Sequence, residues 1–250
     1  MQTPDGSPLI ARFRRARTDE QLAVLEGLHA VKHALRFSAV IDVLAAHDPE
    51  AVASLAARLA PDIAVRLAAM ITPVARPIFD ALSPTPPETG LIAIAARPSG
   101  GIDQLARLGR SAPIVLLESP THSGNIGAAI RVAAAAGAAA VVTTGSVDPW
   151  NPGALRGSAG LHFALPVWST AAIDFPGRTL VALDPAGDEL APASIPADAL
   201  IAFGSERAGL SHDLLARADL RVRIPMEPGV SSLNLATAVA VVLYAWRFRQ

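Results

Sequence analysis

Three short stretches in the second half of the chain bring polar side chains together with glycines. Their chemistry-bearing residues are Asn125, Arg131, Gly204, Glu206, Ser232 and Asn234. An amide, a guanidinium, a carboxylate and a hydroxyl can hold a polar substrate by hydrogen bonds and stabilise charge that develops during a reaction. The chain has no cysteine, which excludes a disulfide framework, a thiolate metal site and a Cys nucleophile.

The first stretch begins at Ser119 and runs into a predicted helix. Free backbone N–H groups at such a helix start attract anions. The spacing Gly124-x-x-Gly127 lacks the preceding G-x-G of a dinucleotide fingerprint, and no Gly-Lys-Ser/Thr of a P-loop follows it. Arg131 is the one charge in a nearly all-apolar helix, so it is either a solvated surface arginine or it needs a cleft or a partner. If Asn125 lies in the helix cap, it and Arg131 reach the same cleft.

The second stretch, Phe203–Ser211, starts where a buried strand is expected to end. It is either a turn with an exposed Glu206–Arg207 ion pair, which is worth little, or a ligand loop. In the second interpretation Gly204 allows close approach of a ligand and Glu206 accepts hydrogen bonds. The loop by itself leaves both interpretations open.

The third stretch, Ile224–Asn234, contains two prolines and a glycine, which favour a rigid loop. Ser231, Ser232 and Asn234 cluster at the start of the last predicted helix. A helix cap needs one such residue, and a serine is expected to supply it. The other polar groups are then available for binding.

Strands and helices alternate around these stretches, which predicts a mostly parallel sheet with helices on both faces. Strands are predicted at Ile41–Leu44, Leu91–Ala95, Ile114–Glu118, Ala140–Thr144, Thr179–Leu183, Leu200–Gly204 and Leu220–Ile224. One helix is predicted to begin at Thr18, where the sequence has the form of a capping box, and leucines at helical spacing continue it as far as Leu35. Further helices are predicted over Ala51–Leu59, Ile78–Leu82, Asn125–Ala136 and Ser232–Arg249. Ligands bind such sheets outside the carboxyl ends of the strands. The loops expected there are Ser119–Gly127, Asp184–Gly187, Ser205–Gly209 and Pro225–Asn234.

Composition limits the class of protein. The chain has 250 residues, 51% of them hydrophobic, and a formal net charge of −1, which excludes disorder and a uniformly basic nucleic-acid binder. A local basic patch stays possible, and the candidate arginines are Arg12, Arg14, Arg15, Arg17, Arg247 and Arg249. The apolar run Leu235–Trp246 is too short for a membrane span, and the N-terminus does not read as a signal peptide. His29 and His33 lie four apart with no further ligand set nearby, so no metal site is expected.

Taken together and in this order, the three stretches resemble the three motifs of the SpoU/TrmH family of RNA ribose 2′-O-methyltransferases, which belongs to the SPOUT class of knotted methyltransferases. The matching segments are Gly124–Arg131, Phe203–Ser211, Ile224–Met226 with Ser231–Asn234, and an intermediate element at Arg156–Gly160 and Phe163–Val167. The strong resemblance covers about residues 113–250. This sequence departs from the motifs at His122-Ser123, where the family usually has Asn-Pro, and at Arg207, where a second glycine is common.

The N-terminal part is more weakly similar to the small ribosomal-protein-like (L30e-like) substrate-binding domain common in this family, through Glu26–Val31 and Pro87–Ala93. The resemblance therefore implies an α/β substrate-binding domain over residues 1–96, a linker over 97–112 and a SPOUT methyltransferase domain over 113–250. It also implies a deep trefoil knot at the C-terminus, which is an exception to ordinary chain connections.

The resemblance implies S-adenosyl-L-methionine as methyl donor, RNA (tRNA or rRNA) as substrate, a homodimer, and a cytoplasmic protein without membrane contact. Carried over by motif, the reacting side comprises Arg131, Asn125, Glu206, Ser232 and Asn234, and the cofactor side comprises Gly204, Ile224, Leu233, Met226 and Leu183. Arg131 would clamp a substrate phosphate or stabilise the forming alkoxide, and Glu206 would orient Arg131 or nearby amides. The alternative is a catalytically inactive RNA-binding protein of the same fold. A nucleotide-dependent oxidoreductase is disfavoured by the missing G-x-G-x-x-G.

Overall fold

The computed structural model describes residues 7–101, 104, 108–171, 173, 177–191 and 195–248. Arg249 lies outside these residues. The chain separates into two compact units, one of Met1–Ser99 with Trp150–Ala164 and the other of Gly100–Pro149 with Leu165–Gln250. The division into residues 1–96, 97–112 and 113–250 stays a proposal, and it differs from the compact units in where it places residues 150–164.

The N-terminal unit is an α/β structure around a four-stranded sheet of order β1-β4-β2-β3. Its strands are β1 (Leu22–Glu26), β2 (Ile41–Ala46), β3 (Thr72–Pro73) and β4 (Leu91–Ala96). Its helices are α1 (Pro8–Ala16), α2 (Leu28–Arg36), α3 (Pro49–Leu59), α4 (Ala64–Met70), α5 (Arg76–Asp80) and α7 (Pro152–Gly157). The strands β2 and β4 and the helix α3 lie where the sequence predicted them, α5 lies close to its predicted place, and α4 and β3 were not predicted.

The predicted helix from Thr18 is wrong in its first half. Leu22–Glu26 form the strand β1, and the helix α2 begins only at Leu28. Between them Gly27 has a φ of +91°, which a helix cannot contain. Ala23, Val24 and Leu25 are all buried, so the strand is apolar on both faces, and a run of this kind cannot be told from a buried helix by periodicity.

The basic cluster near the N-terminus lies on α1 and just after it, and this segment is not a detachable arm. Ile10, Phe13 and Ala16 of α1 are buried in the core of the N-terminal unit. Arg12 forms an ion pair with Asp42, and Arg17 is held by a buried carboxylate. Deleting residues 1–17 would therefore remove core side chains together with the charges.

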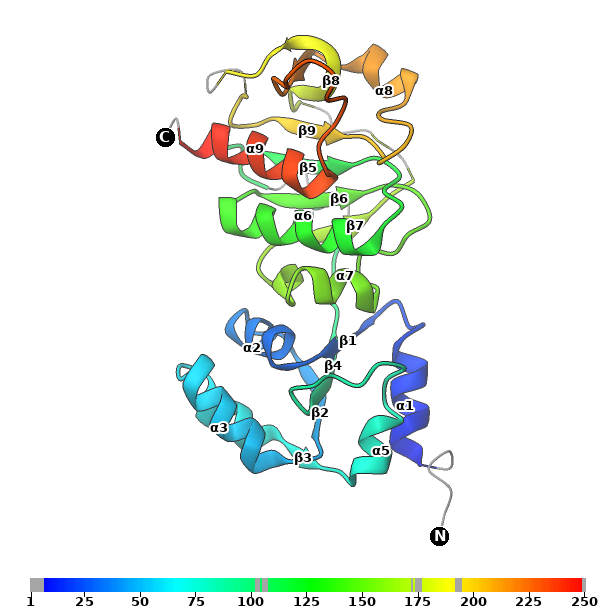
Figure 1. Ribbon diagram of the computed structural model, residues 1–250, viewed down its shortest axis with the longest axis vertical. Coiled ribbons are helices and arrows are strands. Elements are labelled where there is room, and N and C mark those ends of the chain that lie inside the picture. Colours follow the sequence, from blue (N-terminus) through cyan, green and yellow to red (C-terminus); the bar gives the residue numbers. More distant parts are fainter. Residues whose placement is uncertain are drawn as a thin grey trace. The chain divides into compact units, whose positions relative to one another are not determined.

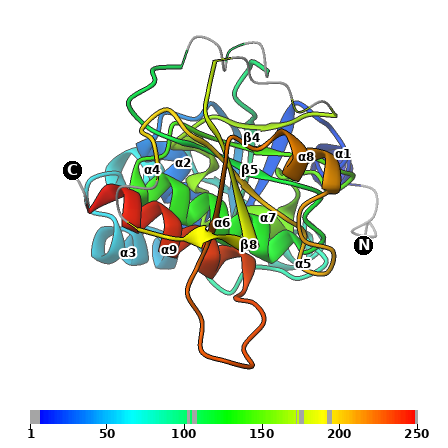
Figure 2. The same ribbon diagram turned by 90° about the horizontal axis from the view of Figure 1, so that it is seen from above.

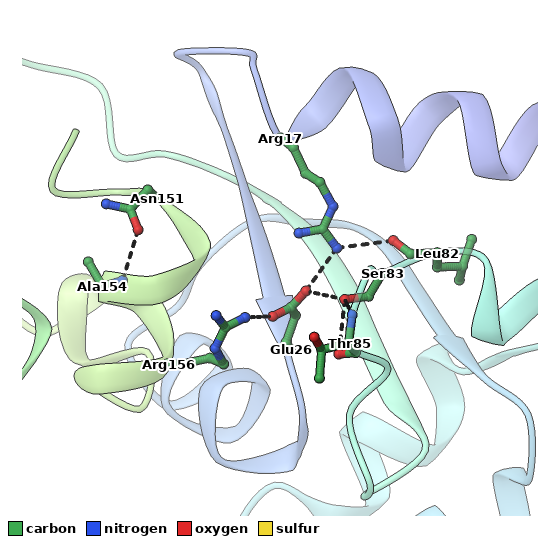
Figure 3. Close-up of polar contacts among 8 residues, drawn as sticks. All are labelled: Arg17, Glu26, Leu82, Ser83, Thr85, Asn151, Ala154 and Arg156. Carbon is green, nitrogen blue, oxygen red and sulfur yellow. Dashed lines mark hydrogen bonds and ion pairs between the residues drawn. The ribbon is translucent and has the colours of Figure 1, made fainter. Parts of the chain in front are cut away.

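That carboxylate belongs to Glu26, whose side chain is 3% exposed. Figure 3 shows Arg17, Ser83 and Arg156 converging on it from three segments of this unit. The Arg17 guanidinium lies 2.8 Å from Oε1, the Ser83 hydroxyl donates to the same oxygen at 2.6 Å, and Arg156 bonds to Oε2. Burial alone would raise the pKa of Glu26, but these hydrogen bonds and the charge of Arg17 lower it below its ordinary value.

Arg156 lies in the segment Trp150–Ala164, which folds with the N-terminal unit although it is distant in sequence. Two further observations show how closely the segment packs on α2. The Nδ1 atom of His33 lies 2.7 Å from the carbonyl oxygen of Ala159, and a Cβ at Gly160 would come within 2.5 Å of the Ala30 carbonyl oxygen. His33 thus has a structural contact, and burial lowers its pKa.

The C-terminal unit is built on a six-stranded sheet of order β10-β8-β9-β5-β6-β7. Its strands are β5 (Ile114–Leu117), β6 (Ala140–Thr143), β7 (Val167–Ser169), β8 (Leu180–Glu189), β9 (Leu200–Phe203) and β10 (Leu220–Arg223). Its helices are α6 (Ser123–Ala136), α8 (His212–Arg217) and α9 (Leu235–Arg247). All neighbouring strands pair in parallel, as the alternation of strands and helices predicted.

Helices cover both faces of this sheet. In Figure 1, α6 and α9 lie side by side across one face, and Figure 2 shows α8 on the other side. Leu214 of α8 packs with Ile114, Leu116, Ala140 and Val142, which share one side of their strands. The helix α6 ends at Gly137 in the left-handed conformation, as predicted. The trefoil knot stays a prediction from the resemblance.

Two local predictions need correction. Residues 184–187 were expected to form a loop after a strand, but they lie within β8, where the pairing with β10 shifts register between Arg221 and Val222. The last helix begins at Leu235 instead of Ser232, and its cap is Asn234 instead of a serine. No helix in the described ranges is long and apolar enough to cross a membrane.

The Glu26 cluster predicts a large stability effect. Replacing Glu26 with Gln leaves Arg17 without its charged partner in a half-buried position, which should lower the free energy of unfolding by about 3 kcal/mol. Because the pKa of Glu26 is lowered from 4.5, its contribution is present at neutral pH and is lost as the pH falls below 4.5 and through the lowered pKa of the folded protein. Denaturant unfolding at pH 7 and pH 3 should therefore show a smaller difference for E26Q than for the wild type.

The matched control is Asp80→Asn, which breaks the exposed Arg76–Asp80 pair in the same unit. It should cost about 0.5 kcal/mol or less. Equal losses for the two variants would contradict the role of the buried cluster.

Candidate functional site

The first and second polar loops leave the sheet from adjacent strand ends. Strands β5 and β9 are neighbours in register, with Leu117 opposite Phe203. Because the strands are parallel, both loops begin at the same edge of the sheet. This is why residues more than eighty positions apart in the sequence come into contact there.

Glu206 of the second loop is held by the first loop. Its Oε2 atom accepts hydrogen bonds from the Thr121 backbone N–H at 3.0 Å and from the Thr121 hydroxyl at 2.8 Å. Its Oε1 atom accepts a hydrogen bond from the Asn125 amide at 2.9 Å. The interpretation of Glu206 as an exposed partner of Arg207 is therefore wrong, since its side chain is 16% exposed and binds neutral donors.

The network continues to the third loop. The Asn234 amide nitrogen donates to Asn125 Oδ1 at 2.9 Å, and Asn234 Oδ1 accepts from the backbone N–H of Ala236 at 2.9 Å. The direction of every bond follows from the carboxylate, which accepts only. The amide nitrogen of Asn125 must face Glu206, so its oxygen faces Asn234, whose own oxygen then caps α9. Three of the five residues predicted for the reacting side thus form one hydrogen-bonded chain.

The charge of Glu206 is stabilised by this arrangement. Burial by itself would raise the pKa of Glu206. The hydrogen bonds from Asn125 and from the backbone and hydroxyl of Thr121 together outweigh this effect and lower the pKa from 4.5 to about 2. A carboxyl group with a lowered pKa stays ionised throughout the neutral range and is a weak proton acceptor there. Glu206 is therefore an organiser of the loops and not a base.

A second carboxylate joins the same two loops in the opposite sense. Glu118, at the start of the first loop, accepts hydrogen bonds from the Ser211 backbone N–H at 2.7 Å and from its hydroxyl at 2.6 Å. Ser211 in turn caps α8. Glu118 is not among the site residues predicted from sequence, although a lone carboxylate directly after a buried strand is the same signal that singled out Glu206.

Gly204 has a different role from the predicted approach of a ligand. A Cβ on this residue would lie 2.0 Å from the carbonyl carbon of Gly209 and 2.2 Å from the nitrogen of Leu210. The loop folds back over Gly204, and Ser205 and Gly209 exchange backbone hydrogen bonds of 3.1 Å. The glycine is needed for the close approach of the chain to itself.

The third loop forms one wall of a cavity of about 350 Å³. Four of the five predicted cofactor residues line it, namely Leu183, Ile224, Met226 and Leu233. Ser232 also lines it, whereas Gly204 does not. Within residues 225–233 only one backbone hydrogen bond is made between the loop's own groups, from Val230 N–H to the Glu227 carbonyl at 3.0 Å. The loop, which projects from the sheet in Figure 2, can therefore offer backbone groups to a ligand.

Arg131 lies on α6 and is exposed. In the described part of the chain no residue makes a hydrogen bond or ion pair with its side chain, and Glu206 does not contact it. Asn125 is the third residue of α6, because the cap position belongs to His122. The condition under which Asn125 and Arg131 were expected to reach one cleft, Asn125 in the helix cap, is not met, because Asn125 lies three residues after the cap.

A parallel α/β sheet covered on both faces, with polar loops gathered at the carboxyl ends of its strands beside an apolar cavity, is the arrangement of a ligand-binding α/β domain. The sequence model of the SpoU rRNA Methylase family matches residues 112–244. This match covers more than half of the chain, and the chain belongs to this family.

Relatives and solved structures agree with this assignment. The chain is 26% identical over 242 residues to the 23S rRNA (guanosine(2553)-2′-O)-methyltransferase RlmP of Bacillus subtilis, covering 94% of this chain and 92% of that one. It is 31% identical over 182 residues to the 23S rRNA (uridine(2479)-2′-O)-methyltransferase of Streptomyces viridochromogenes, covering 64% of this chain. The crystal structure of the SpoU methyltransferase AviRb from Streptomyces viridochromogenes in complex with AdoMet matches with a TM-score of 0.77 at 25% identity, covering 96% of this chain and 97% of that one.

The matched stretch spans 59% of the Streptomyces relative's length. It spans 54% of an uncharacterized tRNA/rRNA methyltransferase of Synechocystis, to which the chain is 36% identical over 154 residues.

Gly204 gives a direct test of the loop geometry. Replacing Gly204 with Ala adds one carbon in contact with the backbone of Gly209, which should lower the free energy of unfolding by about 3 kcal/mol. Gly209→Ala is the matched control. Its Cβ would meet nothing within 4 Å, so only its φ of +68° is unfavourable, at about 1 kcal/mol. Denaturant unfolding measures both, and a larger loss for G209A would contradict this account of the loop.

Proposed function

We propose that this protein transfers a methyl group from S-adenosyl-L-methionine to a ribose 2′-hydroxyl of tRNA or rRNA. The observation that carries the proposal is the hydrogen-bonded chain Glu206–Asn125–Asn234, which joins the three loops that hold the family's motifs. Relatives named as 2′-O-methyltransferases support the reaction type.

The residues of the cavity fit the methyl donor. Leu183, Ile224 and Leu233 supply apolar walls, and the loop backbone, which makes one hydrogen bond between its own groups, offers N–H and carbonyl groups that can bind the edge of a base. When bound, S-adenosyl-L-methionine supplies a methyl group activated by a positively charged sulfur. Met226 completes the apolar lining, and Gly204 acts indirectly by allowing the second loop to fold.

On the reacting side, the polar residues bind and orient the substrate. The guanidinium of Arg131 stays protonated, so it acts as a clamp for a substrate phosphate or as a stabiliser of the developing oxyanion. Asn125 and Asn234 are fixed in orientation by Glu206, and Ser232 faces the cavity. Positioning of this kind provides most of the rate enhancement when the nucleophile is a weak hydroxyl.

The proposal includes a homodimer acting in the cytoplasm, where its RNA substrates occur, with the N-terminal unit as an L30e-like substrate-binding domain. Exposed apolar side chains at the end of the C-terminal unit support dimer formation. Val241 of α9 is 38% exposed, and Phe248, directly after this helix, is 81% exposed. Exposed apolar surface of this kind is typical of protein interfaces.

A catalytically inactive RNA-binding protein of the same fold is the alternative. The presence of all the polar motif residues of the reacting side, including Arg131, favours the enzyme, because an inert binder does not need them. Calorimetry with S-adenosyl-L-methionine separates the two, since binding of the donor is required only by the enzyme.

Arg131 tests the catalytic assignment. Labelled methyl donor and total tRNA and rRNA should give labelled RNA with the wild type, and the modified ribose can then be mapped. Arg131→Ala should lower the transfer rate by at least about 100-fold. The affinity for the donor, measured by calorimetry, should stay within a few-fold because no contact of Arg131 supports the cavity. A variant that keeps most of its rate would remove Arg131 from the mechanism.

The oligomeric state has its own test. Val241→Glu places a charge in the apolar patch and should convert the dimer to a monomer in sedimentation experiments. Val65→Glu, at an apolar residue of the N-terminal unit that is 85% exposed, is the control and should leave the dimer intact. A wild-type monomer, or a V241E dimer, would contradict the proposed interface.

A further inference from the structure

The cavity beside the third loop carries charged side chains as well as apolar ones. Among the described residues, the charged side chains that line it are Asp184, Arg223 and Glu227. Two carboxylates and one guanidinium give its wall one excess negative charge. The wall is therefore electrostatically suited to a ligand with a positive charge.

The ion-pair partners of these side chains do not cancel the excess. Arg221 lies 3.5 Å from Asp184 Oδ2, and Glu189 lies 3.4 Å from Arg223, so the partners add one charge of each sign. Both distances are longer than those of strong charge-assisted hydrogen bonds. Arg221 also donates to the carbonyl oxygen of Leu215 at 2.8 Å, so it neutralises Asp184 only in part.

The two carboxylates differ in their contact with water. The side chain of Asp184 is 13% exposed, and its Oδ1 atom accepts a hydrogen bond from the Ala186 backbone N–H at 3.0 Å. Glu227 is exposed. Salt screens exposed charges more strongly than partly buried ones. We therefore expect Asp184 to influence a bound charge more than Glu227 does.

The size of the cavity lets these charges act on any part of a ligand inside it. A volume of about 350 Å³ corresponds to a width of about 9 Å, which is close to the Debye length of about 8 Å at physiological salt. A charge bound in the cavity is thus only partly screened from each lining charge. At this range one unit charge changes an affinity by about twofold to fivefold.

The donor and the product of the proposed reaction differ by one unit of charge. S-adenosyl-L-methionine carries a sulfonium, an ammonium and a carboxylate at neutral pH, which leaves one net positive charge. When the methyl carbon leaves, the electron pair of its bond stays on sulfur. The product S-adenosyl-L-homocysteine is then a thioether without net charge, and it keeps the adenosine and amino-acid groups of the donor.

We propose that Asp184 and Glu227 are specificity residues, whose charges raise the affinity of the cavity for the cationic methyl donor relative to its neutral product. The apolar walls and the loop backbone meet groups that the two molecules share, so they do not distinguish them. The carboxylates act on the one property that changes in the reaction, and they favour replacement of the product by fresh donor. This inference rests on the proposed function and adds the discrimination between donor and product.

The test is calorimetry of the full chain with each of the two molecules. Asp184→Asn keeps the oxygen that accepts from Ala186 and removes the charge, and Glu227→Gln is the equivalent change at the second residue. D184N should lower the affinity for S-adenosyl-L-methionine by about fivefold, E227Q by about twofold and the double variant by about tenfold. The affinity for S-adenosyl-L-homocysteine should change by less than about twofold in each variant. At 1 M salt the difference should shrink, because the Debye length falls to about 3 Å.

A third ligand separates charge from shape. Sinefungin carries an ammonium group on carbon in place of the methyl sulfonium, so it has the charge of the donor on a different atom. Its affinity should fall in D184N and in the double variant as that of the donor does. If sinefungin behaves like the neutral product instead, the carboxylates do not act through charge.

The matched control is Asp213→Asn. Asp213 is an exposed carboxylate in the first turn of α8 in the same unit, and it does not line the cavity. Its replacement removes the same charge from the chain and should leave all three affinities unchanged. A loss of donor affinity in D213N equal to that in D184N would mean that only the total charge of the chain matters, and the proposal would be wrong.

Failure of this inference is distinguishable from failure of the proposed function. If the wild type binds neither S-adenosyl-L-methionine nor its product, the proposed function fails. If the wild type binds both, and the double variant changes the ratio of the two affinities by less than about twofold, only the discrimination by Asp184 and Glu227 fails.

Discussion

The site depends on the ionised carboxylate of Glu206 lying between two adjacent strand ends. The parallel register of β5 and β9 delivers the first and second loops to the same edge, and Glu206 then binds the first loop through Thr121 and Asn125. Because the carboxylate accepts only, it sets the direction of every later bond as far as the cap of α9. One charge therefore orients two asparagines and defines the start of the last helix.

The parallel sheet and the helices of the C-terminal unit could be predicted from sequence because their signals are local. Buried strands such as Ile114–Leu117 are short apolar runs, and the helix that ends at Gly137 has an explicit stop signal. The three polar loops could be placed at one edge because parallel strands end together. The motifs then indicated the family, which the match over residues 112–244 shows.

What could not be predicted depends on contacts between distant residues. The partner of Glu118 is Ser211, and no pattern within either loop specifies that pairing. Gly204 is required because its own loop folds back on it, so that a Cβ there would lie 2.0 Å from the carbonyl carbon of Gly209. In the sequence, a glycine indicates only a close approach and does not show whether a ligand or the chain itself approaches. In the N-terminal unit, the sequence pattern predicts a helix where the strand β1 forms, because burial on both faces removes the strand's period of two. The capture of Trp150–Ala164 by Glu26 also had no local signal.

The buried carboxylate of Glu26 and the two carboxylates of the site, Glu206 and Glu118, differ in the partners that neutralise them, and this difference bears on function. Glu26 is 3% exposed and binds two arginines, so the cationic charges around it are used within the fold. Glu206 and Glu118 bind backbone N–H groups, hydroxyls and an amide. Such donors satisfy a carboxylate without consuming a cation. Arg131 has no carboxylate partner among the described residues, which is consistent with the phosphate-binding role proposed for it. The net charge of −1 hides this distinction, because it counts a paired arginine and an unpaired one alike.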